Sequence, residues 1–148
     1  MFGATNDVDV DFLILADRAE VINNKLYLMG GGWDQFLVVD FAQPVGLSLA
    51  VAVLIPWQAT NLQHTVTLAI QDADARDILT IPTAMVTGRP PQMEAGAVQR
   101  VPLAFPAIPL TLPGPGSYVV SARINGVEKK RITFRATQAP RPPLFPGR

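Results

Sequence analysis

Prolines and glycines interrupt this chain so often that its sequence argues against long helices. Fourteen of the 148 residues are proline and eleven are glycine. Proline lacks a backbone donor and disrupts helix interiors, and glycine favours turns. Between these residues no window shows a sustained apolar period of 3.6, which would mark an amphipathic helix. The sequence therefore predicts a mostly β protein.

Runs of apolar residues indicate where the strands lie. Phe12–Ala16 and Leu26–Met29 flank Asn23 and Asn24, a pair that tolerates left-handed backbone and predicts a tight hairpin turn. The almost continuous apolar run Leu47–Ile55 predicts a central strand buried on both faces. Further along, His64–Gln71 alternates as a half-buried strand does, and 72–77 turns it back into Ile78–Ile81. Three prolines within Val101–Leu112 confine that segment to an edge strand or extended coil.

The last hairpin is the clearest segment and suggests the fold. Asn125-Gly126 is a strong turn signal, and the preceding residues alternate inward as Tyr118, Val120, Ala122 and Ile124. Such an ending is typical of immunoglobulin-like domains. We expect an all-β, two-sheet antiparallel β-sandwich over residues 1–137, followed by an extended Pro-rich C-terminal tail over 138–148.

Composition narrows the function classes. The chain is 49% apolar and 16% charged, which suits one domain with a real core, and its formal net charge of zero gives no support to nucleic-acid binding. Residues 1–77 carry an excess of seven negative charges and residues 78–148 the same excess of positive charges. The molecule is strongly dipolar if those halves segregate, and the asymmetry vanishes if their strands interleave.

The chain's cellular setting follows from what it lacks. It has no cysteine, three aspartates near its N-terminus where a signal peptide is apolar, and no apolar run long enough to cross a bilayer. We expect a soluble protein of the cytoplasm that binds no membrane and that is also compatible with incorporation into a virion.

Three consecutive glycines, Gly30, Gly31 and Gly32, admit two readings. A phosphate-binding loop needs a lysine and a following helix, whereas Trp33 and further β-like residues follow here. We predict instead a kink or bulge that lets the chain bend from one sheet toward the other, with Trp33 covering the exposed backbone. Replacing Gly31 by valine is then expected to damage folding.

Two aspartate clusters leave calcium binding open. Asp7, Asp9 and Asp11 alternate along one face of an expected strand, and Asp72, Asp74 and Asp77 lie in a turn. Carboxylate oxygens suit calcium, but neither cluster completes a helix-loop-helix site, so a solvated strand face and a polar turn are the structural alternatives.

No catalytic constellation stands out. His64 is the only histidine, and none of the serines Ser48, Ser117 and Ser121 lies in a nucleophile elbow. The sequence predicts neither an enzyme nor a cofactor.

Candidate interaction residues lie elsewhere. Outward-facing basic residues of the last hairpin form either an ordinary solvated face or a contact for an acidic protein, and Trp57 is an expected interface anchor or sugar platform. The residues concerned are Trp57, Arg123, Lys129, Arg131, Arg141 and Phe145.

Several motifs resemble a bacterial and phage family of small β-sandwich proteins of unknown function. They are Phe12–Asp17, Lys25–Asp34, Ile55–Trp57, Arg89–Pro91 and Gly116–Tyr118. The resemblance implies a compact β-sandwich and assigns no catalytic residue.

Two functions follow as hypotheses. The first is a non-enzymatic structural or interaction module, such as a capsid decoration or tail-associated subunit of a virion, that docks on protein partners through sheet edges and extended termini. The alternative is a carbohydrate- or calcium-binding β-sandwich.

Overall fold

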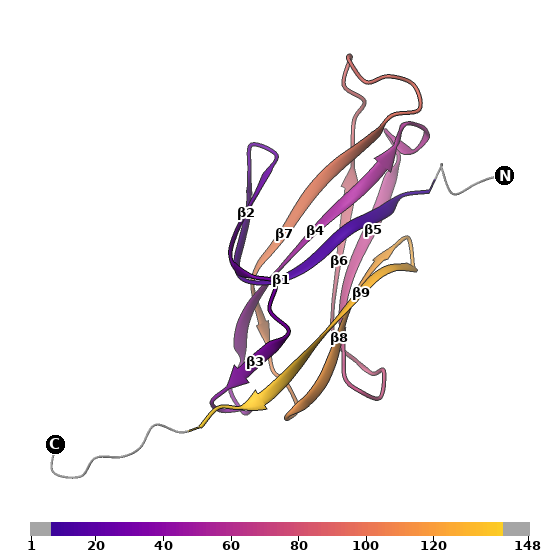
Figure 1. Ribbon diagram of the computed structural model, residues 1–148. Helices are drawn as coiled ribbons and strands as arrows, with labels where there is room; N and C mark the ends of the chain where they lie inside the picture. The colour runs from indigo at the N-terminus through magenta and orange to yellow at the C-terminus, as the bar shows by residue number, and fades with distance from the viewer. Residues whose placement is uncertain (1–6, 141–148) are drawn as a thin grey trace, which may run out of the picture.

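A computed structural model describes residues 7–140 of the chain (Figure 1). Nine strands and one 3-10 turn, Trp57–Ala59, make up its regular structure within that range. The strands are β1 (Asp9–Ile22), β2 (Lys25–Gly31), β3 (Gln35–Val38), β4 (Val45–Pro56), β5 (Gln63–Gln71), β6 (Asp77–Val86), β7 (Val98–Leu110), β8 (Gly116–Ile124) and β9 (Val127–Gln138).

The strands form two sheets that face each other, which confirms the predicted all-β sandwich. The first sheet has the order β2-β1-β4-β7 and the second the order β3-β9-β8-β5-β6. All pairs are antiparallel except β3 with β9. Setting aside β2 and β3, strands β1, β4 and β7 take the places of A, B and E in an immunoglobulin sandwich, and β5, β8 and β9 those of C, F and G.

The core lies between the sheets and draws on nearly every strand. Its largest fully buried side chains include Leu15, Leu49, Ile55, Leu68 and Ile70. As predicted, β4 is buried on both faces, because the small residues of its outer face are covered as completely as the leucines of its inner face. Apolar surface removed from water in this way is the main stabilising term of the fold.

A bulge in β1 changes which of its residues face the core. The pairing of β1 with β4 shifts register between Val10 and Phe12. Val10 is buried before the shift, whereas Leu13 and Leu15 are buried after it, so the inward parity changes by one residue. A bulged residue bends its strand and resets the alternation in this way.

The β8–β9 hairpin has the structure predicted for it. Asn125 and Gly126 form its turn with φ angles of 50° and 85°, and Tyr118, Val120, Ala122 and Ile124 are all buried. The Tyr118 hydroxyl donates to the Gly114 carbonyl oxygen at 2.5 Å. This contact is the tyrosine corner of immunoglobulin-like domains, in which the tyrosine at the start of strand F bonds the backbone just upstream.

The proline-rich segment is an edge strand. β7 is the last strand of the first sheet and pairs with β4 over almost its whole length, with an irregularity opposite Leu47–Leu49. Just after β9, Ala139 is buried, and its N–H donates a hydrogen bond to the Val38 carbonyl oxygen. The packed chain thus extends past residue 137, and residues 141–148 of the predicted tail lie outside the described residues.

Candidate functional site

The β1–β2 hairpin, defined here as residues 17–31, stands away from the sandwich beside β7 (Figure 1). Its two-residue turn, Asn23 and Asn24, has φ angles of 51° and 62°, as a type I′ turn requires. The pairing of β1 with β4 ends at Ala16, so beyond that residue β1 keeps only β2 as its ladder partner. The predicted hairpin is confirmed, and it proves to be a projecting one.

This hairpin exposes large apolar side chains on its outer face. Cross-strand pairing places Arg18 opposite Met29, Glu20 opposite Tyr27 and Ile22 opposite Lys25 on that face. On that face Ile22, Tyr27 and Met29 are 49%, 53% and 67% exposed, and Val21 on the opposite face is 37% exposed. Exposed apolar side chains gathered on one projecting element are typical of protein contact surfaces. Alternation in the sequence identifies the strands but does not show that nothing covers these side chains.

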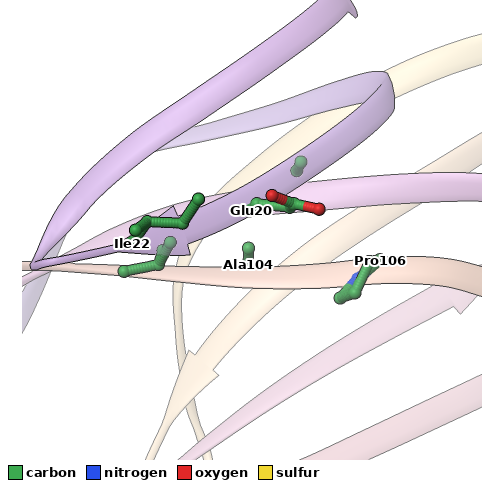
Figure 2. A pocket seen from close by; sticks show the side chains of 6 residues that line it. Glu20, Ile22, Ala104 and Pro106 are labelled. Carbon is green, nitrogen blue, oxygen red and sulfur yellow. The ribbon is translucent and has the colours of Figure 1, made fainter.

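A cleft of about 290 Å³ separates the hairpin from β7. Residues 19–22 of β1 line one wall, and Ala104 and Pro106 line the other (Figure 2). It adjoins a second hollow that reaches Asp17, Arg18, Ser48 and Ala107. The walls are mostly apolar, while Glu20 and Arg18 add charges at the rim.

Ser48 lines the second hollow and connects the strands around it. Its hydroxyl donates to the Asp17 carbonyl oxygen at 3.3 Å and accepts the N–H of Ala107 at 3.2 Å. It therefore ties β4 to both β1 and β7 at the irregularity where Ala107 adopts a φ of 52°. The sequence shows Ser48 only as a serine outside any nucleophile elbow, and no local pattern indicates this bridging role.

The glycine triplet lies where the chain passes from the first sheet to the second. β2 ends at Gly31, and β3 begins in the other sheet four residues later. Gly30 and Gly32 have φ angles of 62° and 86°, and a Cβ at Gly30 would collide with the Asp17 carboxylate. Gly31 lacks a left-handed φ, and a Cβ there would make ordinary contacts at 3.5 Å. The conformational demand thus falls on Gly30 and Gly32, not on Gly31 as the proposed valine substitution assumed.

Trp33 lies just after the crossing and packs against the second sheet. Its ring stacks on Phe36 at 5.1 Å between centroids and meets Phe134 edge-on at 6.2 Å. The ring thus anchors the start of β3 to β9.

Trp57 is not a free aromatic platform. The Arg89 guanidinium carbon lies 3.5 Å from the centre of its ring. The same guanidinium donates to the Trp57 carbonyl oxygen at 2.9 Å and to Thr60 Oγ1 at 3.0 Å. Two of the motifs quoted above, distant in sequence, therefore meet in a cation–π contact that covers one face of the tryptophan.

Two of the basic candidates, Arg123 and Arg131, make contacts within the chain. Arg123 pairs with Asp77 at 3.4 Å, and Arg131 makes two bonds of 3.0 Å to Glu128. The Gln71 amide, with Arg123, lowers the pKa of Asp77, and Arg131 lowers that of Glu128. Lys129 lies beside a small hollow near Asp7. The other two candidates, Arg141 and Phe145, lie outside the described residues.

The only histidine takes part in structural contacts. His64 is buried, its Nε2 donates to the Ala59 carbonyl oxygen at 2.9 Å, and its Nδ1 accepts from the Asn125 amide at 3.2 Å. Asn125 Oδ1 also accepts the Thr65 N–H at 2.9 Å. The turn residue Asn125 thus links the β8–β9 hairpin to β5.

The aspartate clusters are engaged in local hydrogen bonds and ion pairs. Asp72 Oδ1 accepts the N–H groups of Asp74 and Arg76, as in a polar turn. Asp11 pairs with Arg100 of β7 at 2.8 Å. Within residues 7–140 no group of three or more potential metal-binding side chains comes together. In the same range, no helix is long and apolar enough to cross a membrane.

The family model of a family of unknown function, DUF6941, matches residues 11–137. The chain belongs to this family. The matched range begins within β1 and ends one residue before the end of β9, so it includes both sheets and the hairpin. The bacterial and phage source suggested by the sequence resemblance is not part of this match.

Two solved structures match the chain at low sequence identity. One is a Pseudomonas fluorescens alkylpurine DNA glycosylase AlkC bound to DNA containing an abasic site analog, with 15% identity and a TM-score of 0.47. The match covers 89% of this chain, which spans 30% of the length of the glycosylase chain. Another is an immunoglobulin-like protein from Pseudomonas aeruginosa, with 11% identity, a TM-score of 0.43, and 91% and 100% of the two chains covered. No curated protein matches the chain.

Proposed function

We propose that this protein is a non-enzymatic interaction module that docks on a protein partner through the β1–β2 hairpin and the sheet edges. The chain belongs to a family of unknown function and forms an immunoglobulin-like sandwich, and both observations are compatible with such a role. The finer form of the proposal is a subunit of a larger assembly, such as a capsid decoration or tail-associated subunit of a virion.

The exposed apolar surface of the hairpin carries this proposal. Tyr27 and Met29 are 53% and 67% exposed on an element that leaves the sandwich. Leaving such side chains in water forgoes about 25 cal/mol per Å² of apolar area that a partner would bury. Aromatic residues and methionine are also enriched in protein interfaces.

The carbohydrate- and calcium-binding alternative gains no such support. Its expected sugar platform, Trp57, has one ring face covered by Arg89. Its expected calcium ligands include Asp72 and Asp77, which already accept hydrogen bonds from neighbouring groups. We therefore propose the interaction module alone.

Photo-crosslinking in cells that naturally produce the protein tests the proposal. In the test variant a photoreactive phenylalanine analogue replaces Tyr27. In the control variant it replaces Val127, which is 56% exposed in the β8–β9 hairpin. We expect discrete adducts of higher mass from position 27 and few from position 127. The proposal is wrong if position 27 gives no adduct and the purified full chain also stays monomeric at high concentration.

A further inference from the structure

β2 differs from the other three edge strands in lacking protection against pairing. Edge strands are commonly blunted by proline, by charge or by shortness. β7 contains three prolines, β6 contains Pro82, and β3 has only four residues. β2 has seven residues, no proline and a single charge, Lys25, at one end. The least protected edge thus belongs to the same hairpin that exposes the apolar side chains.

The turn of the hairpin determines which backbone groups of β2 point outward. In a two-residue hairpin the residues next to the turn, Ile22 and Lys25, form a hydrogen-bonded pair, and pairs of the two kinds alternate from there. Leu26 and Leu28 fall in non-hydrogen-bonded pairs with β1. Their N–H and C=O groups are consequently directed toward the free edge, where another strand can bind them.

The β2 edge is complementary to itself. When two β2 strands run antiparallel about a twofold axis at Leu28, each Tyr27 lies opposite Met29 of the second copy, so the exposed apolar side chains of the two copies contact one another. The two Lys25 residues then lie six positions apart, about 20 Å along the strand, which avoids repulsion.

We propose that two copies of this chain pair edge to edge through β2, antiparallel and centred on Leu28, so that their two β1–β2 hairpins form one four-stranded antiparallel sheet. This inference rests on the proposed function and names its partner as a second copy. Two seven-residue strands form a small interface, so we expect a dissociation constant of roughly micromolar size.

Disulfide trapping tests the pairing, because the native chain has no cysteine. Leu28→Cys places the two sulfurs across the twofold axis, where Cα atoms of a hydrogen-bonded pair lie about 5.5 Å apart, within disulfide range. Mild oxidation should convert most of the full-length variant to a covalent dimer. The matched control is Val86→Cys, which is 63% exposed on the proline-containing edge strand β6, and it should stay largely monomeric.

Mixing two single variants tests the register. Tyr27→Cys and Met29→Cys should cross-link to each other several-fold faster than either does to itself. If Tyr27→Cys forms the faster homodimer, the axis lies elsewhere and the proposed register is wrong. Circular dichroism of each variant checks that the sandwich remains folded.

Sedimentation of cysteine-free protein provides a measurement that needs no cross-link. We expect concentration-dependent dimerisation of the native chain, weakened at least tenfold by Met29→Lys, because lysine on an edge opposes strand pairing. A monomeric native chain, together with equal trapping of Leu28→Cys and Val86→Cys, would overturn the self-pairing. If position 27 still gives adducts with a different protein in cells, the interaction module stands while the second copy is excluded as its partner.

Discussion

At the scale of single residues, close contacts decide which positions tolerate change. Gly30 is required by its left-handed φ and by the Asp17 carboxylate that lies against it, whereas its neighbour Gly31 meets neither condition. Both residues look alike in the sequence, since three identical glycines follow one another. Only the backbone conformation distinguishes them.

Gly30→Ala should therefore destabilise the protein and Gly31→Ala should not. A residue with a Cβ in left-handed backbone costs about 1–2 kcal/mol, and displacing the Asp17 carboxylate adds to that. Urea unfolding followed by tryptophan fluorescence measures the two free energies of unfolding. Equal losses for both variants would contradict this assignment of roles.

At the scale of elements, Ser48 of β4 connects the β1–β2 hairpin to the proline-rich strand β7 through hydrogen bonds to Asp17 and Ala107. The sequence predicted the turn at Asn23 and Asn24 and the edge position of β7 correctly. It did not predict that β1 leaves β4 after Ala16, where the Ser48 hydroxyl bonds Asp17 of β1 and Ala107 of β7. Such contacts join residues 31 and 59 positions apart, beyond any local pattern.

Ser48→Ala should loosen the attachment of the hairpin. The change removes two hydrogen bonds and leaves the Ala107 N–H without its acceptor, at a cost of about 1–3 kcal/mol. Hydrogen exchange of the full-length variant should be faster than that of the native chain in residues 17–31, with a smaller change in β8 and β9. As a control, Ser117→Ala, at a position whose hydroxyl only accepts a bond of 3.5 Å from Arg135, should leave exchange in the hairpin unchanged.

At the scale of the whole molecule, strands from both halves of the chain share each sheet. The first sheet combines early strands with β7, and the second combines β3 and β5 with later strands. The acidic and basic halves of the sequence are therefore interleaved in part, and ion pairs such as Asp11 with Arg100 join them. The basic residues of β8 and β9 nevertheless remain together on the second sheet.

The ion pair between Asp77 and Arg123 should make stability depend on pH below neutrality. The Gln71 amide and the Arg123 guanidinium lower the pKa of Asp77 in the folded state, so the stabilisation is present above the ordinary pKa of about 4 and is lost as pH falls through the lowered value. Asp77→Asn should be slightly less stable than the native chain at pH 7, and the difference should shrink at pH 3. Urea unfolding at both pH values measures it, and a difference that grows at pH 3 would show the opposite sign.

The sequence by itself determined the class of the fold, the two tight turns, the buried central strand and the inward residues of β8. These features follow from local chemistry. Asparagine and glycine tolerate left-handed backbone in turns, proline lacks the N–H donor that a central strand needs, and side chains alternate with a period of two along a strand. The tertiary structure alone decided that Trp57 lies under Arg89, that Gly30 rather than Gly31 is constrained, and that the apolar hairpin projects with an unprotected edge. Each of these three features depends on contacts between residues far apart in the sequence. A local sequence pattern does not show which distant residues cover a side chain.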